Sequence, residues 1–403
     1  MPSKPDIILF SLFRWDSEIS SSALALAKEF SKNHRVFYIN HPFSLKDLFK
    51  SFSNKKVRKR MLSLLFGKYI SEPIPANKDL WGITPKLTLP INFLNQGILY
   101  EFFAAINNKI INRTVRKIIS HNSIENYLFL NCYNPYFFKN IYSKLKPSFY
   151  IYYSMDDISQ ASYTNRHGTR LEKEIILNYD FSLTTSMELL RLKQEISSTV
   201  YYLPNAADIS LFLTALNSEL SIPFDWIFND QKTIGYIGAI ESRIDYELLY
   251  QIAKSNEDKM IVLVGPIVTN EYKEHKLDKL KNVRLLGQKS YEDLPAYLRQ
   301  MDIALIPFKK NKLTKSIYPL KINEYLAAGK AVVSTDFSED IKAFKDVIYI
   351  GCNHADFVSK IDLAFKENNQ IRIDQRIEVA KSNTWEARVK LFWKILEKYQ
   401  TIN

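Results

Sequence analysis

The stretch Asp302–Thr335, DIALIPFKKNKLTKSIYPLKINEYLAAGKAVVST, contains the side chains whose types and spacing best suit chemistry. We expect a strand to end at Pro307, four lysines to follow in a loop, and a helix to begin at Pro319 and stop at Gly329. The free backbone N–H groups from Leu320 onward and the positive end of the helix dipole attract anions. This segment therefore predicts a diphosphate site that needs no glycine-rich loop.

A lysine and a glutamate follow on this expected helix. Lys321 and Glu324 are three residues apart and share one helix face, so Lys321 can reach a phosphate while Glu324 accepts hydrogen bonds from two ribose hydroxyls. Lys309 and Lys312 in the preceding loop can add positive charge. The alternative interpretation is an exposed Lys–Glu pair, which stabilises a helix by about 0.2–0.5 kcal/mol.

Glycines give a second indication of a ligand face. Neither GxGxxG nor GxxxxGK[ST] occurs, but Gly238, Gly265, Gly287 and Gly351 each directly follow an expected strand. Open parallel sheets bind ligands beyond the carboxyl ends of their strands, where glycine lets a ligand approach the backbone. The alternative is that these are ordinary turn glycines.

Acidic residues near two other strand ends are candidates for a general base. Asp156 and Asp157, in YYSMDDIS, follow the expected strand Phe149–Tyr153, and adjacent carboxylates can raise one another's pKa. One of them could remove the proton of an acceptor hydroxyl, although Asp also favours helix N-caps. Asp16, in LFRWDSE, is a second candidate, and His167 is expected to be an ordinary surface histidine.

These residues must be positioned by two cores, because 403 residues exceed what one core usually supports. Short apolar strands alternate with helical patterns throughout the chain, which predicts an α/β protein with two doubly wound parallel sheets. We expect domains at residues 1–205 and 206–381, and a terminal helix at 382–403 that caps its own domain or crosses back to the other one. The strands expected in the first domain are Asp6–Leu12, Arg35–Asn40, Tyr127–Asn131, Phe149–Tyr153, Phe181–Thr185 and Val200–Leu203. Those in the second are Thr233–Ile237, Met260–Val264, Val283–Leu286, Ile303–Ile306, Ala331–Ser334 and Ile348–Ile350.

Positive charge is concentrated in the first part of the chain. The formal net charge is +12, and residues 1–150 hold 22 lysines and arginines against 9 aspartates and glutamates. Seven cations lie within Lys46–Arg60, beside apolar side chains that continue to Phe66, which predicts an anionic membrane surface as a partner of residues 46–66. A solvated loop is the alternative. The apolar stretch Ile91–Ile106 could assist, but an ordinary core helix is favoured there.

Several classes of partner and cofactor are not expected. No nucleic-acid motif is present, and no Asp-x-Asp between strands, HExxH or CxxC suggests a metal. We therefore expect no metal or cofactor. Two distant cysteines, Cys132 and Cys352, the absence of a secretory signal pattern and the absence of a long apolar run favour a cytoplasmic protein at the inner face of the plasma membrane.

The motifs resemble a known family. PLKINEYLAAGKAVVST is similar to the donor-binding segment of GT-B glycosyltransferases of family 4, or group 1, and of bacterial teichuronic acid and exopolysaccharide glycosyltransferases. IGYIGAIESRIDYELL, VLVGP and NVRLLGQKSYEDLPAYLRQMDIALIPF resemble other parts of the same domain, and YLPNAADISLF and TWEARVKLF resemble its borders. The resemblance covers nearly the whole of Tyr152–Tyr399 and weakens over the first 150 residues.

The resemblance implies two Rossmann-like domains facing a central cleft, with the C-terminal helix crossing back to the first domain. It implies that the second domain binds a nucleotide sugar without metal and that the first binds the acceptor. Family 4 retaining enzymes carry Glu-x7-Glu, but Ser316 stands eight positions before Glu324, which leaves retention or inversion open. The usual Arg and Lys pair after Gly238 is also incomplete, with Arg243 present and Asp245 further on.

The function predicted from these observations is a metal-independent hexosyltransferase. It would move a sugar from a nucleotide diphosphate sugar, UDP being the favoured nucleotide, to a glycan acceptor on a lipid carrier in bacterial surface polysaccharide synthesis. A GT-B-shaped nucleotide-sugar epimerase, which would act on a soluble substrate, and a two-domain binding protein without chemistry are the alternatives.

Overall fold

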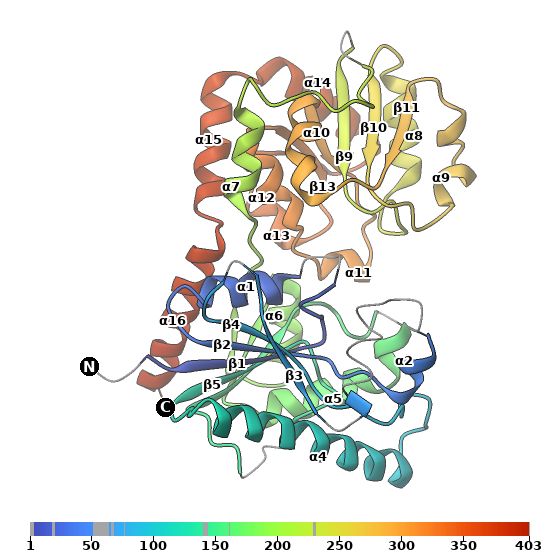
Figure 1. Cartoon of the computed structure of the whole chain (residues 1–403). Coiled ribbons are helices and arrows are strands. Elements are labelled where there is room, and N and C mark those ends of the chain that lie inside the picture. Colours follow the sequence, from blue (N-terminus) through green and yellow to red (C-terminus); the bar gives the residue numbers. More distant parts are fainter. Residues whose placement is uncertain are drawn as a thin grey trace. The chain divides into compact units, whose positions relative to one another are not determined.

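The computed structural model describes residues 4–17, 21–50, 64–65, 68–75, 77–139, 144–160, 162–228 and 231–402. The chain divides into two compact units, one made of Met1–Leu203 with Val389–Asn403 and the other of Pro204–Arg388 (Figure 1). Each unit contains its own twisted sheet. The prediction of an α/β fold with two doubly wound units is confirmed.

The first unit contains an eight-stranded sheet in the order β3-β4-β2-β1-β5-β6-β7-β8. All its neighbouring strands are parallel except β3 and β4, which pair antiparallel. The strands are β1 (Asp6–Ser11), β2 (Val36–Asn40), β3 (Ile70–Pro73), β4 (Leu80–Thr84), β5 (Tyr127–Cys132), β6 (Phe149–Ser154), β7 (Phe181–Thr184) and β8 (Val200–Tyr202). Since β2 lies on one side of β1 and β5 on the other, the order in which the chain adds strands reverses between β1 and β5.

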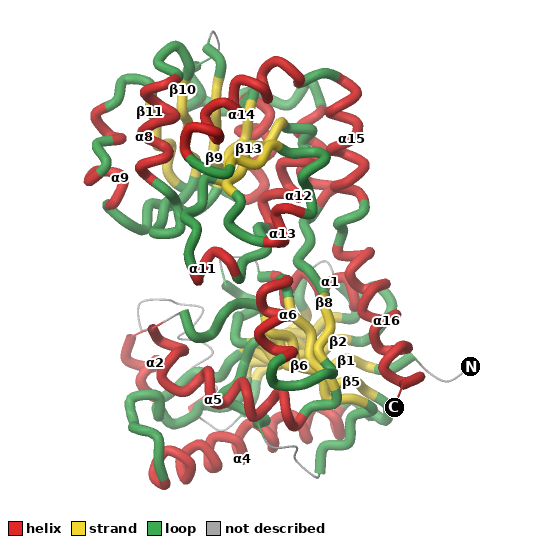
Figure 2. Tube along the Cα trace, turned by 180° about the vertical axis from the view of Figure 1, so that it is seen from behind, coloured by secondary structure: helices red, strands yellow, loops and turns green. Residues whose placement is uncertain are grey.

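Helices cover both faces of this sheet. The helices are α1 (Ser22–Phe30), α2 (Leu45–Lys50), α4 (Ile98–His121), α5 (Ser162–Asn178), α6 (Met187–Gln194) and the terminal α16 (Trp385–Ile402). Ile8, Phe10 and Phe129 alternate along their strands toward one face, where they share a core with residues of α4 and α5. Phe30 of α1 contacts Phe392 of α16 edge to face, with ring centroids 5.0 Å apart, and Figure 2 shows α16 beside this unit.

The second unit contains a six-stranded, all-parallel sheet in the order β11-β10-β9-β12-β13-β14. The strands are β9 (Thr233–Ile237), β10 (Met260–Val264), β11 (Val283–Gly287), β12 (Ile303–Ile306), β13 (Ala331–Thr335) and β14 (Tyr349–Gly351). Their side chains are almost completely buried in the four central strands, as expected when helices cover both faces of a parallel sheet. In this sheet the order in which the chain adds strands reverses between β9 and β12.

The helices of the second unit form two layers around its sheet (Figure 1). Helices α7 (Ile209–Leu213), α10 (Leu294–Gln300), α12 (Leu320–Ala327) and α15 (Gln370–Lys381) contact one another, and α8 (Tyr246–Ser255) contacts α14 (His354–Glu367). Short helices α9 (Glu271–Glu274), α11 (Lys312–Lys315) and α13 (Glu339–Lys342) lie in connections. The expected lysine loop therefore contains one helical turn, α11, whose N-terminus is closed by a capping box between Asn311 and Thr314.

Candidate functional site

In the second unit, β9 and β12 are the two strands between which the strand order reverses. Open α/β sheets bind ligands at the carboxyl ends of such strands. Strand β9 pairs with β12 only through Ile234 and Gly235, so the backbone of Ile237 has no partner on that side. The Tyr325 hydroxyl of α12 fills the gap, because it accepts from the Ile237 N–H at 2.8 Å and donates to the Ile237 carbonyl at 3.1 Å. Tyr325 thereby fixes the start of α12 beside the end of β9.

Glycines allow the strand ends to approach one another here. Gly238 follows β9 with a φ of 151°, and a Cβ atom on it would lie 2.7 Å from the Tyr236 hydroxyl and 3.1 Å from Lys321 Nζ. Gly265 follows β10 with a φ of 150°, and a Cβ atom there would lie only 2.0 Å from the Gly238 carbonyl oxygen. Both positions therefore require glycine, and not only as turn residues. Gly287 contributes its carbonyl, which accepts from the Gly265 N–H at 2.9 Å.

Lys321 brings a positive charge to this edge and forms no salt bridge with a described carboxylate. Its ammonium lies 5.0 Å from the centroid of the Tyr236 ring and 4.8 Å from that of Phe308. Burial, with the nearby Arg243, lowers the pKa of Lys321, while the charges of Glu324 and Glu241 oppose this shift from beyond ion-pair distance. A cation that is held by two rings and forms no salt bridge can bind an anion.

Glu324 lies one turn further along α12. Its Oε1 accepts a hydrogen bond from the Tyr291 hydroxyl at 3.2 Å, and burial raises the pKa of the Glu324 carboxyl. No cation of the described part of the chain lies within 4.0 Å of this carboxylate, and Lys321 acts on it only through its charge, which opposes the effect of burial on the pKa of Glu324. The carboxylate therefore keeps acceptor capacity for a ligand with hydroxyl groups.

The other expected donor-site residues differ in how far they are already engaged. Arg243 pairs with Glu241, and Lys309 pairs with Glu271 at 2.7 Å. Lys312 is exposed on α11. Helix α12 begins at Leu320, with Pro319 as its N-cap, one residue later than the sequence predicts.

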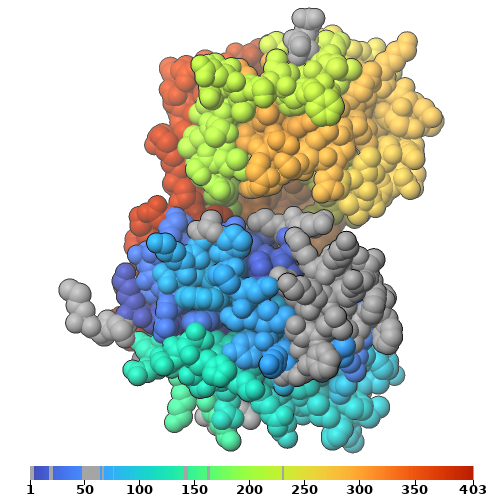
Figure 3. All heavy atoms as spheres, in the orientation of Figure 1, coloured from blue at the N-terminus to red at the C-terminus, as the bar shows by residue number. Residues whose placement is uncertain are grey.

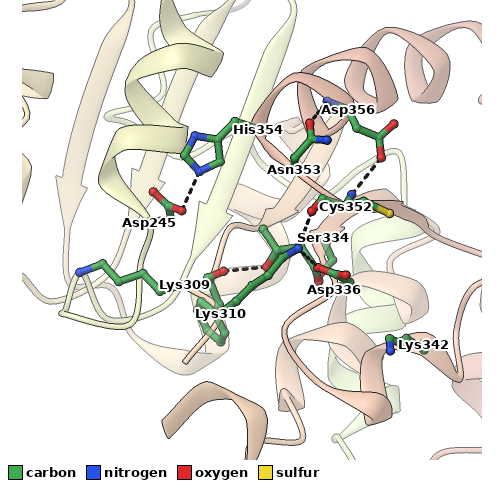
Figure 4. Close-up of polar contacts among 12 residues, drawn as sticks. Asp245, Lys309, Lys310, Ser334, Asp336, Lys342, Cys352, Asn353, His354 and Asp356 are labelled. Carbon is green, nitrogen blue, oxygen red and sulfur yellow. Dashed lines mark hydrogen bonds and ion pairs between the residues drawn. The ribbon is translucent and has the colours of Figure 1, made fainter. Parts of the chain in front are cut away.

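A polar cluster lies near the ends of β12, β13 and β14. Lys309 and Lys310 point in opposite directions, and Lys310 contacts Asp336 and the Cys352 carbonyl (Figure 4). Asp245 N-caps α8 and pairs with His354 at 2.9 Å. Because Asp245 caps α8 and pairs with His354, it has a structural role in this unit.

The first unit also brings candidate groups to the carboxyl edge of its sheet. Asp16 follows β1, and its Oδ1 lies 3.3 Å from Arg14 Nε and 3.5 Å from the Asn40 amide nitrogen at the end of β2. Asp156 follows β6 and is exposed. Because only β5 separates β1 from β6, both carboxylates lie on one edge of one sheet.

Asp157 has a local role. Its Oδ1 accepts from the backbone N–H of Ser159 at 3.0 Å and from the Ser159 hydroxyl at 2.7 Å. This is an Asx turn, close to the capping alternative that the sequence allowed. Asp157 therefore has a local structural role, and the assignment of a base to one of these carboxylates stays a prediction.

Two further expectations have an outcome in the structure, and a third lies mostly outside the described residues. His167 is not a surface residue, because it is 3% exposed, stacks on Tyr100 at 4.0 Å and bonds the Leu94 carbonyl. The stretch Ile91–Ile106 is not an ordinary core helix, because α4 begins only at Ile98 and several apolar side chains there are exposed. Most of the basic stretch 46–66, namely residues 51–63 and 66, lies outside the described residues.

Two classes of site were searched for in the described ranges. No helix there has the length and apolar character to cross a membrane. No group of three or more His, Cys, Asp or Glu side chains within those ranges is arranged to hold a metal ion.

Comparison with known proteins confirms the resemblance for the second unit. Residues 231–364 match the family Glycosyl transferases group 1, so the predicted glycosyltransferase domain is confirmed over this range. The chain is also 29% identical over 157 residues to TuaH of Bacillus subtilis strain 168, provisionally named a teichuronic acid biosynthesis glycosyltransferase. The aligned part spans 38% of this chain and 40% of that relative.

Solved structures show the same fold over almost the whole chain. An α,α-trehalose-phosphate synthase (UDP-forming) from Burkholderia vietnamiensis has a TM-score of 0.69 at 10% identity and covers 98% of both chains. The Anabaena protein HepE in complex with UDP has a TM-score of 0.63 at 11% identity, covering 98% of this chain and all of HepE. These similarities confirm the GT-B fold expected from the sequence.

Proposed function

We propose that the chain is a glycosyltransferase that moves a sugar from a UDP-sugar to a glycan acceptor. The observation that carries this proposal is the placement of Lys321 and Glu324 on α12, a cation that forms no salt bridge among the described residues and a carboxylate that keeps acceptor capacity. The first suits a diphosphate and the second a ribose. The family match at residues 231–364 and two similar structures whose descriptions name UDP support the same donor.

The proposed reaction breaks the bond between the anomeric carbon and the diphosphate. Lys321 and the N–H groups at the start of α12 stabilise the negative charge that develops on the leaving UDP. A carboxylate of the first unit, for which Asp156 and Asp16 are the candidates, takes the proton from the acceptor hydroxyl as its oxygen bonds to the anomeric carbon. Base catalysis of this kind accompanies inversion, so the anomeric configuration of the product tests the assignment.

We further propose that the acceptor is carried on a lipid, in surface polysaccharide synthesis, and that the protein works at an anionic membrane. Helix α4 supports this part, because its exposed residues Ile98, Phe102, Ala105, Lys109, Arg113 and Arg116 follow one another at helical spacing. Apolar side chains occupy the first half of this stripe and cations the second, so that one end of the helix offers apolar groups to a bilayer interface and the other end cations to anionic lipids. Figure 3 shows atoms of this part of the sequence, in cyan and teal, at the lower surface of the first unit.

Incubation with labelled nucleotide sugars and a cell-envelope lipid extract tests the activity. We expect label from one UDP-sugar to enter the lipid fraction, and Glu324→Ala to abolish it. Conversion of the free nucleotide sugar to its epimer would instead identify an epimerase. Absence of both products with every donor, while UDP still binds, would favour a binding protein without chemistry.

A further inference from the structure

The first unit contains a pocket that none of the residues discussed as catalytic lines. Its volume is about 400 Å³. It lies between the end of β2 with α2, the segment before α4, and residues of α4, α5 and the loop after β5. The lining residues are His41, Pro42, Ser44, Lys46, Asp47, Thr88, Leu89, Pro90, Ile91, Asn92, Phe93, Asn107, Tyr136, Phe137 and Arg166.

One wall of the pocket is fastened in place from two helices. Asn107 of α4 donates its amide to the Leu89 carbonyl at 2.9 Å and accepts from the Leu89 N–H at 2.8 Å. From α5, the buried His167 bonds the Leu94 carbonyl at 3.0 Å, and Arg166 donates to the Asn95 side chain at 2.7 Å. The segment that carries Leu89 to Phe93 is therefore held by side chains, and the pocket is preformed.

His41 supplies a neutral polar group. Its Nδ1 lies 3.0 Å from the Asn134 amide nitrogen, which donates to it, so the ring proton is placed on Nε2. Burial and the nearby Arg14 lower the pKa of His41 to about 4, so the ring is uncharged at neutral pH. Among the described residues, no partner bonds Nε2, which leaves this N–H available to a ligand.

The charged groups of the pocket favour an anion. Lys46 and Arg166 are exposed on different elements, α2 and α5. The one carboxylate of the lining, Asp47, already accepts from the Ser44 N–H at 2.7 Å and from the Ser44 hydroxyl at 2.8 Å. Aromatic side chains, Phe93 and Tyr136 among them, complete the lining, and such faces suit the C–H surfaces of sugars.

We propose that this pocket binds an acidic saccharide unit of the acceptor, with its carboxylate or phosphate between Lys46 and Arg166. This inference rests on the proposed function and deepens it. The bound unit is a neighbour of the reacting sugar, because His41 follows Asn40, whose side chain bonds the Trp15 N–H at 2.9 Å next to the candidate base Asp16. The pocket would then determine which acceptors are used.

Binding of small anionic sugars to the whole protein tests the proposal. Ligand-observed NMR titrations would compare glucuronic acid and glucose 1-phosphate with glucose, at physiological ionic strength. We expect the anionic sugars to bind at least tenfold more tightly than glucose, and the preference between them to distinguish a carboxylate from a phosphate. Equal binding of all three would overturn the proposal.

Matched variants locate the binding. Arg166→Gln and Lys46→Gln should each weaken binding of the anionic sugars at least fivefold, whereas Lys117→Gln, an exposed cation of α4 outside the lining, should not. An equal effect of Lys117→Gln would show unspecific charge attraction and contradict the proposal. UDP affinity, measured on the same samples, should be unchanged in all three variants. Failure of the wild type to bind UDP would count against the proposed function and not against this pocket.

Discussion

Charged side chains near the carboxyl edges of the two sheets differ in whether they form salt bridges. In the second unit Lys321 and Glu324 are half-buried and act on each other only through their charges, without a salt bridge, and Glu324 accepts from the Tyr291 hydroxyl. In the first unit, Lys193 and Glu172 are buried and pair at 2.6 Å. Removing a charge from water is costly unless a direct partner replaces the water. We therefore interpret the charges without a salt bridge as groups that bind a ligand, and the directly paired ones as a support.

The support in the first unit lies close to Asp156. Glu172 accepts from the Ser154 hydroxyl at 2.7 Å and from the Tyr152 hydroxyl at 3.0 Å, as well as pairing with Lys193. Tyr152 and Ser154 belong to β6, whose end carries Asp156. The network thus holds the strand that presents the candidate base, and contributes to catalysis only through position.

The largest effect is expected at the candidate base itself. Asp156→Asn should lower the rate of sugar transfer by about 10²–10⁴-fold, because a general base contributes that much, while UDP affinity stays unchanged. Steady-state assays with calorimetry would measure both. Asp157→Asn is the matched control and should retain most activity, since its carboxylate serves the turn with Ser159. If Asp16→Asn is inactive and Asp156→Asn is active, the base is Asp16. Full activity of all three variants would contradict the assignment of a catalytic base to this edge of the sheet.

Breaking the buried pair should mainly reduce stability. Glu172→Gln leaves the Lys193 ammonium buried without a counter-charge, which costs about 3–5 kcal/mol of unfolding free energy. Chemical denaturation would measure the loss in the first unit. Glu195→Gln removes a carboxylate from the exposed pair with Arg191 and is the control, with little change expected. Equal stability of Glu172→Gln and the wild type would contradict the supporting role.

Lys321, which forms no salt bridge among the described residues, should make donor binding depend on pH. Because the pKa of Lys321 is lowered in the free protein, the ammonium that attracts the diphosphate is lost at lower pH than on a surface lysine. UDP affinity should therefore fall as pH rises above neutral, by up to about tenfold per pH unit, with proton uptake on binding. Calorimetry in buffers of different ionisation enthalpy would measure this. Lys321→Arg should flatten the profile, and a wild-type profile that is already flat from pH 7 to 9.5 would refute this account.

The smallest effect is expected where α12 is attached to β9. Tyr325→Phe removes the hydroxyl that bonds both backbone groups of Ile237, at an expected cost of about 1–3 kcal/mol in stability. UDP affinity should also fall slightly, because Lys321 loses its fixed position beside Gly238. Tyr318→Phe, whose hydroxyl bonds Asn323 within the same region, is a control for stability alone. An unchanged melting temperature for Tyr325→Phe would show that packing alone holds α12.

The second unit could be predicted closely from its residues. The bounds expected for β9, β10 and β12 agree with the structure, because buried apolar runs there are limited by Gly, Pro and Asp. Lys321 and Glu324 were found through their spacing. Tyr236, Tyr291, Tyr325 and Phe308 were not, since sequence does not show that aromatic residues from four elements meet around one lysine and one glutamate.

The first unit was less predictable for physical reasons. Strands β3 and β4 were missed: β3 is short, contains Glu72 and Pro73, and is only partly buried, as edge strands often are. The exposure of Ile98 and Phe102 contradicts the usual preference of apolar side chains for a core. His167 was misjudged because its partners, Tyr100 and the Leu94 carbonyl, lie far from it in sequence.

Calorimetric titration of the wild type and Glu324→Ala with UDP tests the central claim most directly. The account predicts that UDP binds the wild type without added metal. The variant should lose about 10–150-fold in affinity, since hydrogen bonds to a charged acceptor contribute about 1.5–3 kcal/mol. Its melting temperature without ligand should be close to that of the wild type, because the carboxylate forms no salt bridge among the described residues and its hydrogen bond is with the Tyr291 hydroxyl. Equal UDP affinity of the two proteins would contradict the assignment of α12 as the donor site.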